Sequence, residues 1–119
     1  MNNSIGKKYD HEKIQPSIVL GDFSRALIEV CRAGDTGIIK YGPGNWLKVE
    51  NAAQRYDNAM IRHWLQSKIE STDSESNLLH LAHTAWNALA CLELELRSQS
   101  IDYSLNEKIS VQFVDGTKE

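Results

Sequence analysis

Apolar residues recur at helical spacing in three stretches of the chain. The first stretch follows Asp22, a residue suited to cap a helix, and predicts a helix over 22–33 that can resume to 39. Two further helices are predicted over 51–69 and 76–98. In the last of these, leucine and alanine fall on one wide face, which predicts the side that packs into the core. That face comprises Leu78, Leu81, Ala82, Ala85, Ala88, Leu89, Leu92 and Leu96.

Glycine, proline and hydroxyl residues mark the connections between these helices. Gly34 and Gly37 each weaken a helix by about 1 kcal/mol relative to alanine, so a break or a close contact is expected there. The segment "KYGPGNW" (40–46) is rich in turn formers. The segment "ESTDSESN" (70–77) reads as an acidic loop whose serine or aspartate residues can cap the next helix.

The two ends of the chain differ from its helical middle. Residues 1–15 are polar and predicted to be irregular, and 99–119 form a tail in which "KISVQFV" alternates like a strand over 108–114. Such a strand needs a partner, either "PSIVL" at 16–20 or another subunit. We therefore predict a mainly α single domain of three to four helices over 16–98, with a short C-terminal strand or hairpin.

Composition narrows the class of protein. The 119 residues suit one domain, and a net charge of −3 gives no general electrostatic reason to bind nucleic acid or an anionic membrane. No stretch approaches the apolar length of a membrane span, so a cytoplasmic location is expected. Cys31 and Cys91 lie among apolar residues and suggest free thiols rather than a disulfide framework.

A polar stripe lies opposite the leucine face of the third helix. It contains His80, His83 and Asn87 without the lysine and glutamate of an ordinary solvated face, and it predicts the wall of a polar cleft. The histidine spacing suits one metal ion or one phosphate group, but also a solvated or dimer-facing pair. His63, on the apolar side of the second helix, is either a structural core group or part of the same site.

Several other side chains have both a structural and a functional interpretation. Arg55 and Arg62 suit exposed helix ion pairs as well as phosphate binding. Asp73 and Glu75 precede the third helix, where they either complement the helix dipole or coordinate a metal. Trp46 suits the core or a platform on which a base stacks.

Five motifs follow one another along the chain. They are "KYD..K" (8–13), "ALIEV" (26–30), "KYGPGNW" (40–46), "RYDNAMIRHWL" (55–65) and "DSESNLLHLAHTAWNALACLELEL" (73–96). Taken in this order, they resemble the phage and bacterial dATP/dGTP diphosphohydrolase-like domain of the MazZ type. The similarity covers about residues 8–97, and a glycine is common in that family where this chain has Asn77.

This resemblance implies a helical relative of the MazG-like pyrophosphohydrolases. Those enzymes use Mg²⁺, assemble as dimers or tetramers, and cleave a nucleoside triphosphate to the monophosphate and pyrophosphate. The substrate implied here is a purine deoxynucleotide, and the role is control of the nucleotide pool in a phage. The residues carried over are His63, His80, His83 and Arg62 for catalysis, Lys40, Tyr41, Asn45, Trp46, Arg55, Tyr56 and Asn87 for substrate binding, and Asp73 and Glu75 for the metal. For an enzyme, Glu29 is predicted as a third metal ligand beside them.

The same residues are also compatible with a second function, nucleotide binding without cleavage. The clustered glutamates of MazG-like enzymes, ExxE followed by ExxD, are not readable in this sequence. A site with basic, imidazole and amide groups but few carboxylates suits a phage protein that binds or sequesters a nucleotide, or a nucleotide-derived defence signal, without cleaving it.

Overall fold

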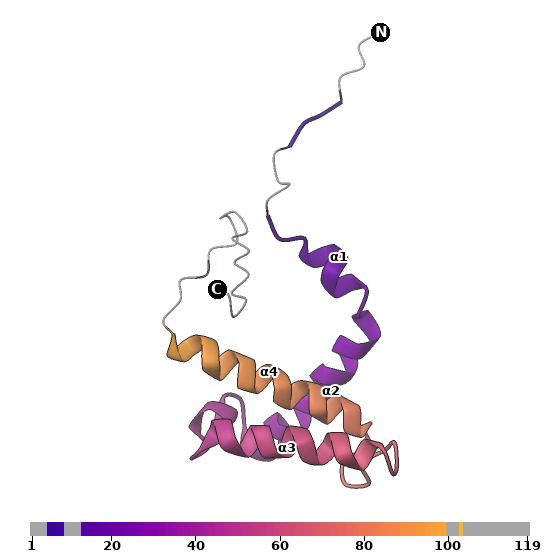
Figure 1. The fold of residues 1–119 in the computed structure, drawn as a ribbon, viewed down its shortest axis with the longest axis vertical. Coiled ribbons are helices and arrows are strands. Elements are labelled where there is room, and N and C mark those ends of the chain that lie inside the picture. The colour runs from indigo at the N-terminus through magenta and orange to yellow at the C-terminus, as the bar shows by residue number, and fades with distance from the viewer. Residues whose placement is uncertain (1–4, 9–12, 100–102, 104–119) are drawn as a thin grey trace, which may run out of the picture.

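The computed structural model describes residues 5–8, 13–99 and 103, and its regular structure is helical (Figure 1). The helices are α1 (Pro16–Gly21), α2 (Ser24–Tyr41), the 3-10 helix η1 (Asn45–Lys48), α3 (Ala52–Ser67) and α4 (His80–Ser98). The mainly α prediction is confirmed. The predicted strand 108–114 lies outside the described residues, and its suggested partner at 16–20 was wrong, because that segment is the helix α1, which begins with a proline.

Helices α3 and α4 lie side by side and form the centre of the fold. Helix α2 packs against α4, and η1 joins α2 to α3 and contacts both (Figure 1). Helix α1 contacts α2 and lies away from the α3–α4 pair (Figure 1). The pair therefore provides the main framework on which side chains from different parts of the sequence meet.

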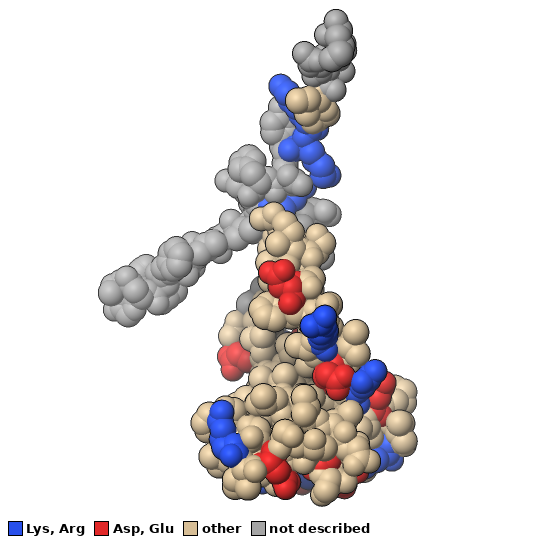
Figure 2. Space-filling model, turned by 90° about the vertical axis from the view of Figure 1, so that its right-hand side faces the viewer, with Lys and Arg blue, Asp and Glu red and all other residues tan. Residues whose placement is uncertain are grey.

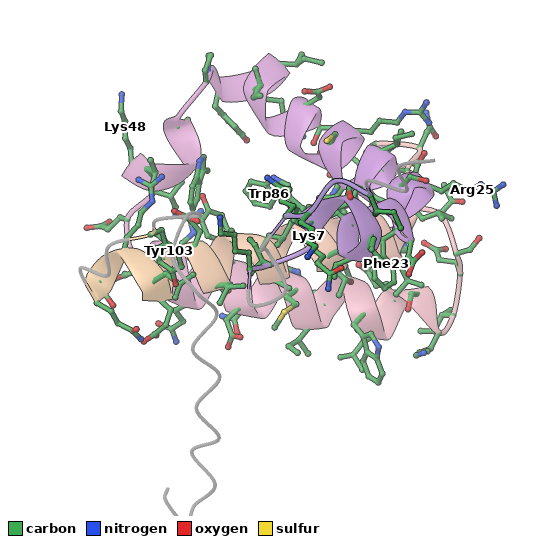
Figure 3. The ribbon with its side chains drawn as sticks, turned by 90° about the horizontal axis from the view of Figure 1, so that it is seen from above. Lys7, Phe23, Arg25, Lys48, Trp86 and Tyr103 are labelled. Atoms are coloured by element: carbon green, nitrogen blue, oxygen red, sulfur yellow. The ribbon has the colours of Figure 1, made fainter. Side chains whose placement is uncertain are left out.

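Helix α2 runs without a break through both of its glycines. An added Cβ at Gly34 would lie 2.8 Å from Nε1 and 3.1 Å from Cδ1 of Trp86, whereas one at Gly37 would meet nothing within 4 Å. Figure 3 shows Trp86 between α2 and α4. The sequence predicted either a helix break or a close contact at these glycines. The structure shows a close contact, and it lies at Gly34.

The predicted caps were wrong at the starts of α2 and α4. Phe23 rather than Asp22 occupies the position before α2, and Leu79 precedes α4, which begins at His80 rather than 76. Neither start has a side-chain cap. Backbone contacts order the loop before α4 instead, since the His80 N–H donates to the Ser71 carbonyl at 2.9 Å.

Most of the leucine face of α4 does not pack into the core, so the prediction was wrong for Leu81, Leu89 and Leu92, although Ala82 on the same face is buried. Leu81, Leu89 and Leu92 are 53%, 49% and 54% exposed, whereas His80 and Asn87 are 1% and 6% exposed. The helix therefore packs on its neighbours through the side that carries the polar stripe. The buried apolar residues in the described part of the chain are small, namely Val30, Ala33, Ala82 and Ala90.

The surface carries charges of both signs. On the helical body in the lower part of Figure 2, acidic and basic side chains are interspersed over a largely uncharged surface. Among the helices that the structure describes, none combines the length and the apolar character needed to cross a membrane.

Candidate histidine site

Three histidines from two helices meet at the interface between α3 and α4. Nδ1 of His63 on α3 lies 2.9 Å from Nδ1 of His80 on α4, a hydrogen-bond distance. The rings of His63 and His83 stack, with centroids 4.6 Å apart and planes at 21°. The sequence predicted these three residues as site candidates, and the structure brings all three together.

Asp73 and Ser76 connect the loop before α4 to His83. The Ser76 hydroxyl donates to Oδ2 of Asp73 at 2.8 Å, and the Ser76 backbone N–H donates to the same oxygen at 3.1 Å. The Ser76 oxygen in turn accepts from the Leu78 N–H at 3.2 Å and lies 2.7 Å from Nε2 of His83. Because the hydroxyl proton is already used, His83 must carry its proton on Nε2, which leaves Nδ1 as its acceptor.

The loop before α4 contains a residue in the left-handed backbone conformation. Asn77 has a φ of 63°, in the left-handed region that glycine adopts at low cost and asparagine tolerates better than most residues. Its N–H donates to the Asp73 carbonyl at 2.7 Å and so closes the turn that carries Asp73 and Ser76. The turn therefore requires a left-handed residue at position 77, a conformation that glycine would adopt at lower cost than asparagine.

The surroundings favour neutral imidazoles at His63 and His83. Burial lowers the pKa of His63 below its ordinary 6.5, and the neighbouring His83 lowers it further, against the opposing effect of Asp73. Burial likewise lowers the pKa of His83, again against Asp73. Burial would raise the pKa of Asp73, but its hydrogen bonds from Ser76 outweigh this and lower the pKa below 3.8. At neutral pH the Asp73 carboxylate is thus charged, and the imidazoles of His63 and His83 are neutral.

The lowered pKa values of His63 and His83 predict how the stability of the fold depends on pH. A histidine whose folded-state pKa lies below 6.5 binds fewer protons than in the unfolded chain between its folded pKa and 6.5. The free energy of unfolding should therefore fall as the pH drops through that window. Urea unfolding from about pH 7.5 to about pH 5 measures this. The double variant His63→Gln/His83→Gln should show a shallower dependence, and an equally steep one would contradict the assignment.

A cluster of aromatic rings lies at another part of the same helices. Tyr56 lies 5.5 Å from Trp86 and 6.3 Å from Trp46, measured between ring centroids, and its hydroxyl donates to the Trp46 carbonyl at 2.6 Å. Burial raises the pKa of Tyr56. Trp46 is thus part of the packing between η1, α3 and α4. Its role as a platform for a base stays a prediction.

The three predicted metal ligands make separate contacts. Asp73 is bonded to Ser76, Glu75 lies 3.2 Å from Nζ of Lys40, and Glu29 lies 2.8 Å from Nη1 of Arg32. Across the residues that the structure describes, no group of three or more histidine, cysteine, aspartate or glutamate side chains is placed to hold one metal ion.

The remaining predicted site residues differ in their exposure to solvent. Asn87 is buried, and its Nδ2 donates to the His83 carbonyl at 2.8 Å, so it supports the helix that carries the site. The half-buried Asn45 begins η1, and the other three, Tyr41, Arg55 and Arg62, are exposed. Sequence reasoning missed Glu70, whose Oε2 lies 3.4 Å from Nε2 of His80. Only its position in an acidic loop ten residues before a histidine could have indicated it.

Comparison of the sequence with protein families gives a match. Residues 3–104 match the family model described as dATP/dGTP diphosphohydrolase, N-terminal. The chain belongs to the dATP/dGTP diphosphohydrolase N-terminal family. The matched range contains every residue of the histidine site, and the family description supports a role related to nucleotide hydrolysis. Searches of curated proteins and of solved structures give no match.

Proposed function

We propose that this member of the dATP/dGTP diphosphohydrolase N-terminal family cleaves a purine deoxynucleoside triphosphate to the monophosphate and pyrophosphate. The observation that carries the proposal is the group of neutral imidazoles at the α3–α4 interface, within a chain of this family. Attack of water on phosphorus needs a group that takes the water proton and cations that offset the phosphate charge. The stacked His63 and His83 suit the first role, and the exposed Arg62 next to His63 suits the second.

Mg²⁺ enters this proposal with the nucleotide. The described side chains do not form a metal site by themselves, and the carboxylates proposed as ligands are bonded elsewhere. Mg²⁺ is commonly bound through substrate phosphates and only one or two protein carboxylates. We therefore derive no catalytic step through the ion and treat it as a variable of the assay.

The proposal is tested by incubating the purified protein with each of the four dNTPs, with and without Mg²⁺. We expect dATP or dGTP to yield equal amounts of dNMP and pyrophosphate, separated by ion-exchange chromatography, while pyrimidine dNTPs react more slowly. A pyrophosphohydrolase of known activity serves as the positive control. If it turns over and this protein releases neither product from any dNTP, the proposed hydrolysis is wrong.

The second candidate function is binding without cleavage, and one observation favours it. The described residues lack the carboxylate cluster on which metal-dependent pyrophosphate release ordinarily depends. Isothermal titration calorimetry with dATP and dGTP, with and without Mg²⁺, distinguishes the two functions. Binding that does not require the metal, with the nucleotide recovered intact, would support sequestration.

We further propose that the protein is a homo-oligomer joined through the leucine face of α4. This face presents Leu81, Ala88, Leu89 and Leu92 to solvent, all of them exposed, with leucines at about 50% of their surface. An exposed apolar stripe on a helix of this length is the kind of surface that a second copy buries. It also accounts for the small core that the described chain buries alone.

The double variant Leu81→Glu/Leu92→Glu tests this assembly. Each buried leucine contributes about 1.5–3 kcal/mol, and a symmetric dimer buries each of them twice, so the dissociation constant should rise by at least about a hundredfold. Size-exclusion chromatography with light scattering measures the mass over a dilution series. Leu47→Glu on η1, another exposed leucine, is the matched control. A wild-type protein that is already monomeric at every concentration would contradict the assembly.

A further inference from the structure

His80 is the most deeply buried side chain of the site, with 1% of its surface exposed. Both ring nitrogens nevertheless have a polar neighbour: Nδ1 lies 2.9 Å from Nδ1 of His63, and Nε2 lies 3.4 Å from Oε2 of Glu70. An imidazole taken out of water needs both nitrogens satisfied. His80 therefore links the exposed carboxylate of Glu70, in the loop that follows α3, to the imidazole of His63.

The direction of the two hydrogen bonds follows from the Glu70 carboxylate, the acceptor at one end of the series Glu70–His80–His63. A carboxylate only accepts, so when the His80 ring carries a single proton, that proton belongs on Nε2, facing Glu70. Nδ1 of His80 is then an acceptor, and Nδ1 of His63 must supply the proton between the two rings. The proton of neutral His63 is thus on Nδ1, and its Nε2 has a free lone pair.

The opposite arrangement, with the His80 proton on Nδ1, places the lone pair of His80 Nε2 against the Glu70 carboxylate. If Nδ1 of His80 donated to His63, the lone pair on Nε2 of His80 would face the Glu70 carboxylate at 3.4 Å, with His80 buried. That contact is repulsive and leaves a buried nitrogen without a donor. In the described part of the chain, Nε2 of His63 has no hydrogen-bond partner that would oppose the first arrangement.

We propose that Glu70 is a positioning residue that acts through His80 to hold His63 in the tautomer with its lone pair on Nε2. The pair Glu70–His80 orients His63 much as a buried carboxylate orients the imidazole base of a hydrolase triad. This inference rests on the proposed function where it makes Nε2 of His63 the atom that accepts the water proton. The hydrogen-bond order itself depends only on the geometry.

Heteronuclear NMR of protein labelled with ¹⁵N-histidine tests the hydrogen-bond order without any substrate. In the wild type, the ¹⁵N shifts and the couplings to ring protons should show protonated Nδ1 on His63 and protonated Nε2 on His80. Glu70→Ala should change the tautomer balance of both rings. Glu70→Gln, whose side-chain carbonyl can still accept from Nε2–H, should restore the wild-type pattern in part. Glu95→Ala, which removes an exposed acid bonded to Gln99, is the control.

Kinetics of the same variants test the catalytic meaning of this order. Glu70→Ala should lower kcat by about tenfold with KM changed less than twofold, and Glu70→Gln should recover part of the loss. Wild-type tautomers opposite to those stated, or tautomers unchanged in Glu70→Ala, would overturn the inference. Wild-type tautomers as stated, in a protein that releases no pyrophosphate, would uphold the positioning by Glu70 and reject the proposed hydrolysis instead.

Discussion

Replacing His63 with glutamine is expected to lower kcat for dNTP cleavage by at least about a hundredfold. Glutamine approximates the size of the ring and can still donate to Nδ1 of His80, now 2.9 Å from the imidazole. It cannot accept a proton from water at neutral pH. The loss should therefore appear in the chemical step, while the melting temperature and the KM change little.

The control for this variant is Gln66→Ala, an exposed position one turn further along α3. It should retain wild-type kcat. The pH profile adds a second criterion, because burial lowers the pKa of His63 and the acidic limb of kcat/KM should accordingly lie below pH 6.5. A His63→Gln protein with wild-type turnover would exclude His63 as the base and leave His83 as the candidate in the stack.

The positions of α2, α3 and α4 could be predicted from sequence, but neither helix α1 nor the side on which α4 packs. Its apolar period correctly marked a helix and an apolar face. The spacing of apolar residues does not indicate whether that face contacts helices of the same chain or remains exposed. In this protein the face with His80 and Ala90 meets α3 and α2, because small and hydrogen-bonded side chains permit close packing, while Leu81 and Leu92 stay at the surface.

The candidate site likewise contains residues that could be predicted from sequence and residues that could not. The three histidines could be predicted because two of them share one helix face and the third lies at an apolar position of the preceding helix. Their partner Glu70 could not, since it belongs to a loop without a period. Their contacts depend on a chain reversal closed at Asn77, whose left-handed φ has no unambiguous sequence signal.

Substituting alanine for glycine is expected to have opposite effects at two positions of α2. At Gly37 the new Cβ meets nothing within 4 Å, so Gly37→Ala should raise the free energy of unfolding by about 0.5–1 kcal/mol. At Gly34 the new Cβ would lie 2.8 Å from Nε1 and 3.1 Å from Cδ1 of Trp86. That overlap should lower the free energy of unfolding by about 1–3 kcal/mol.

Urea unfolding followed by circular dichroism, at one fixed protein concentration, measures both effects on the same scale. The two variants add the same atoms to the same helix, so helix propensity cancels in their difference and the contact with Trp86 remains. In a Trp86→Leu background that contact is lost, and Gly34→Ala should then stabilise the protein as Gly37→Ala does. If Gly34→Ala is already stabilising with Trp86 in place, then α2 does not pack on α4 through this indole. The crossing of those two helices must then lie elsewhere.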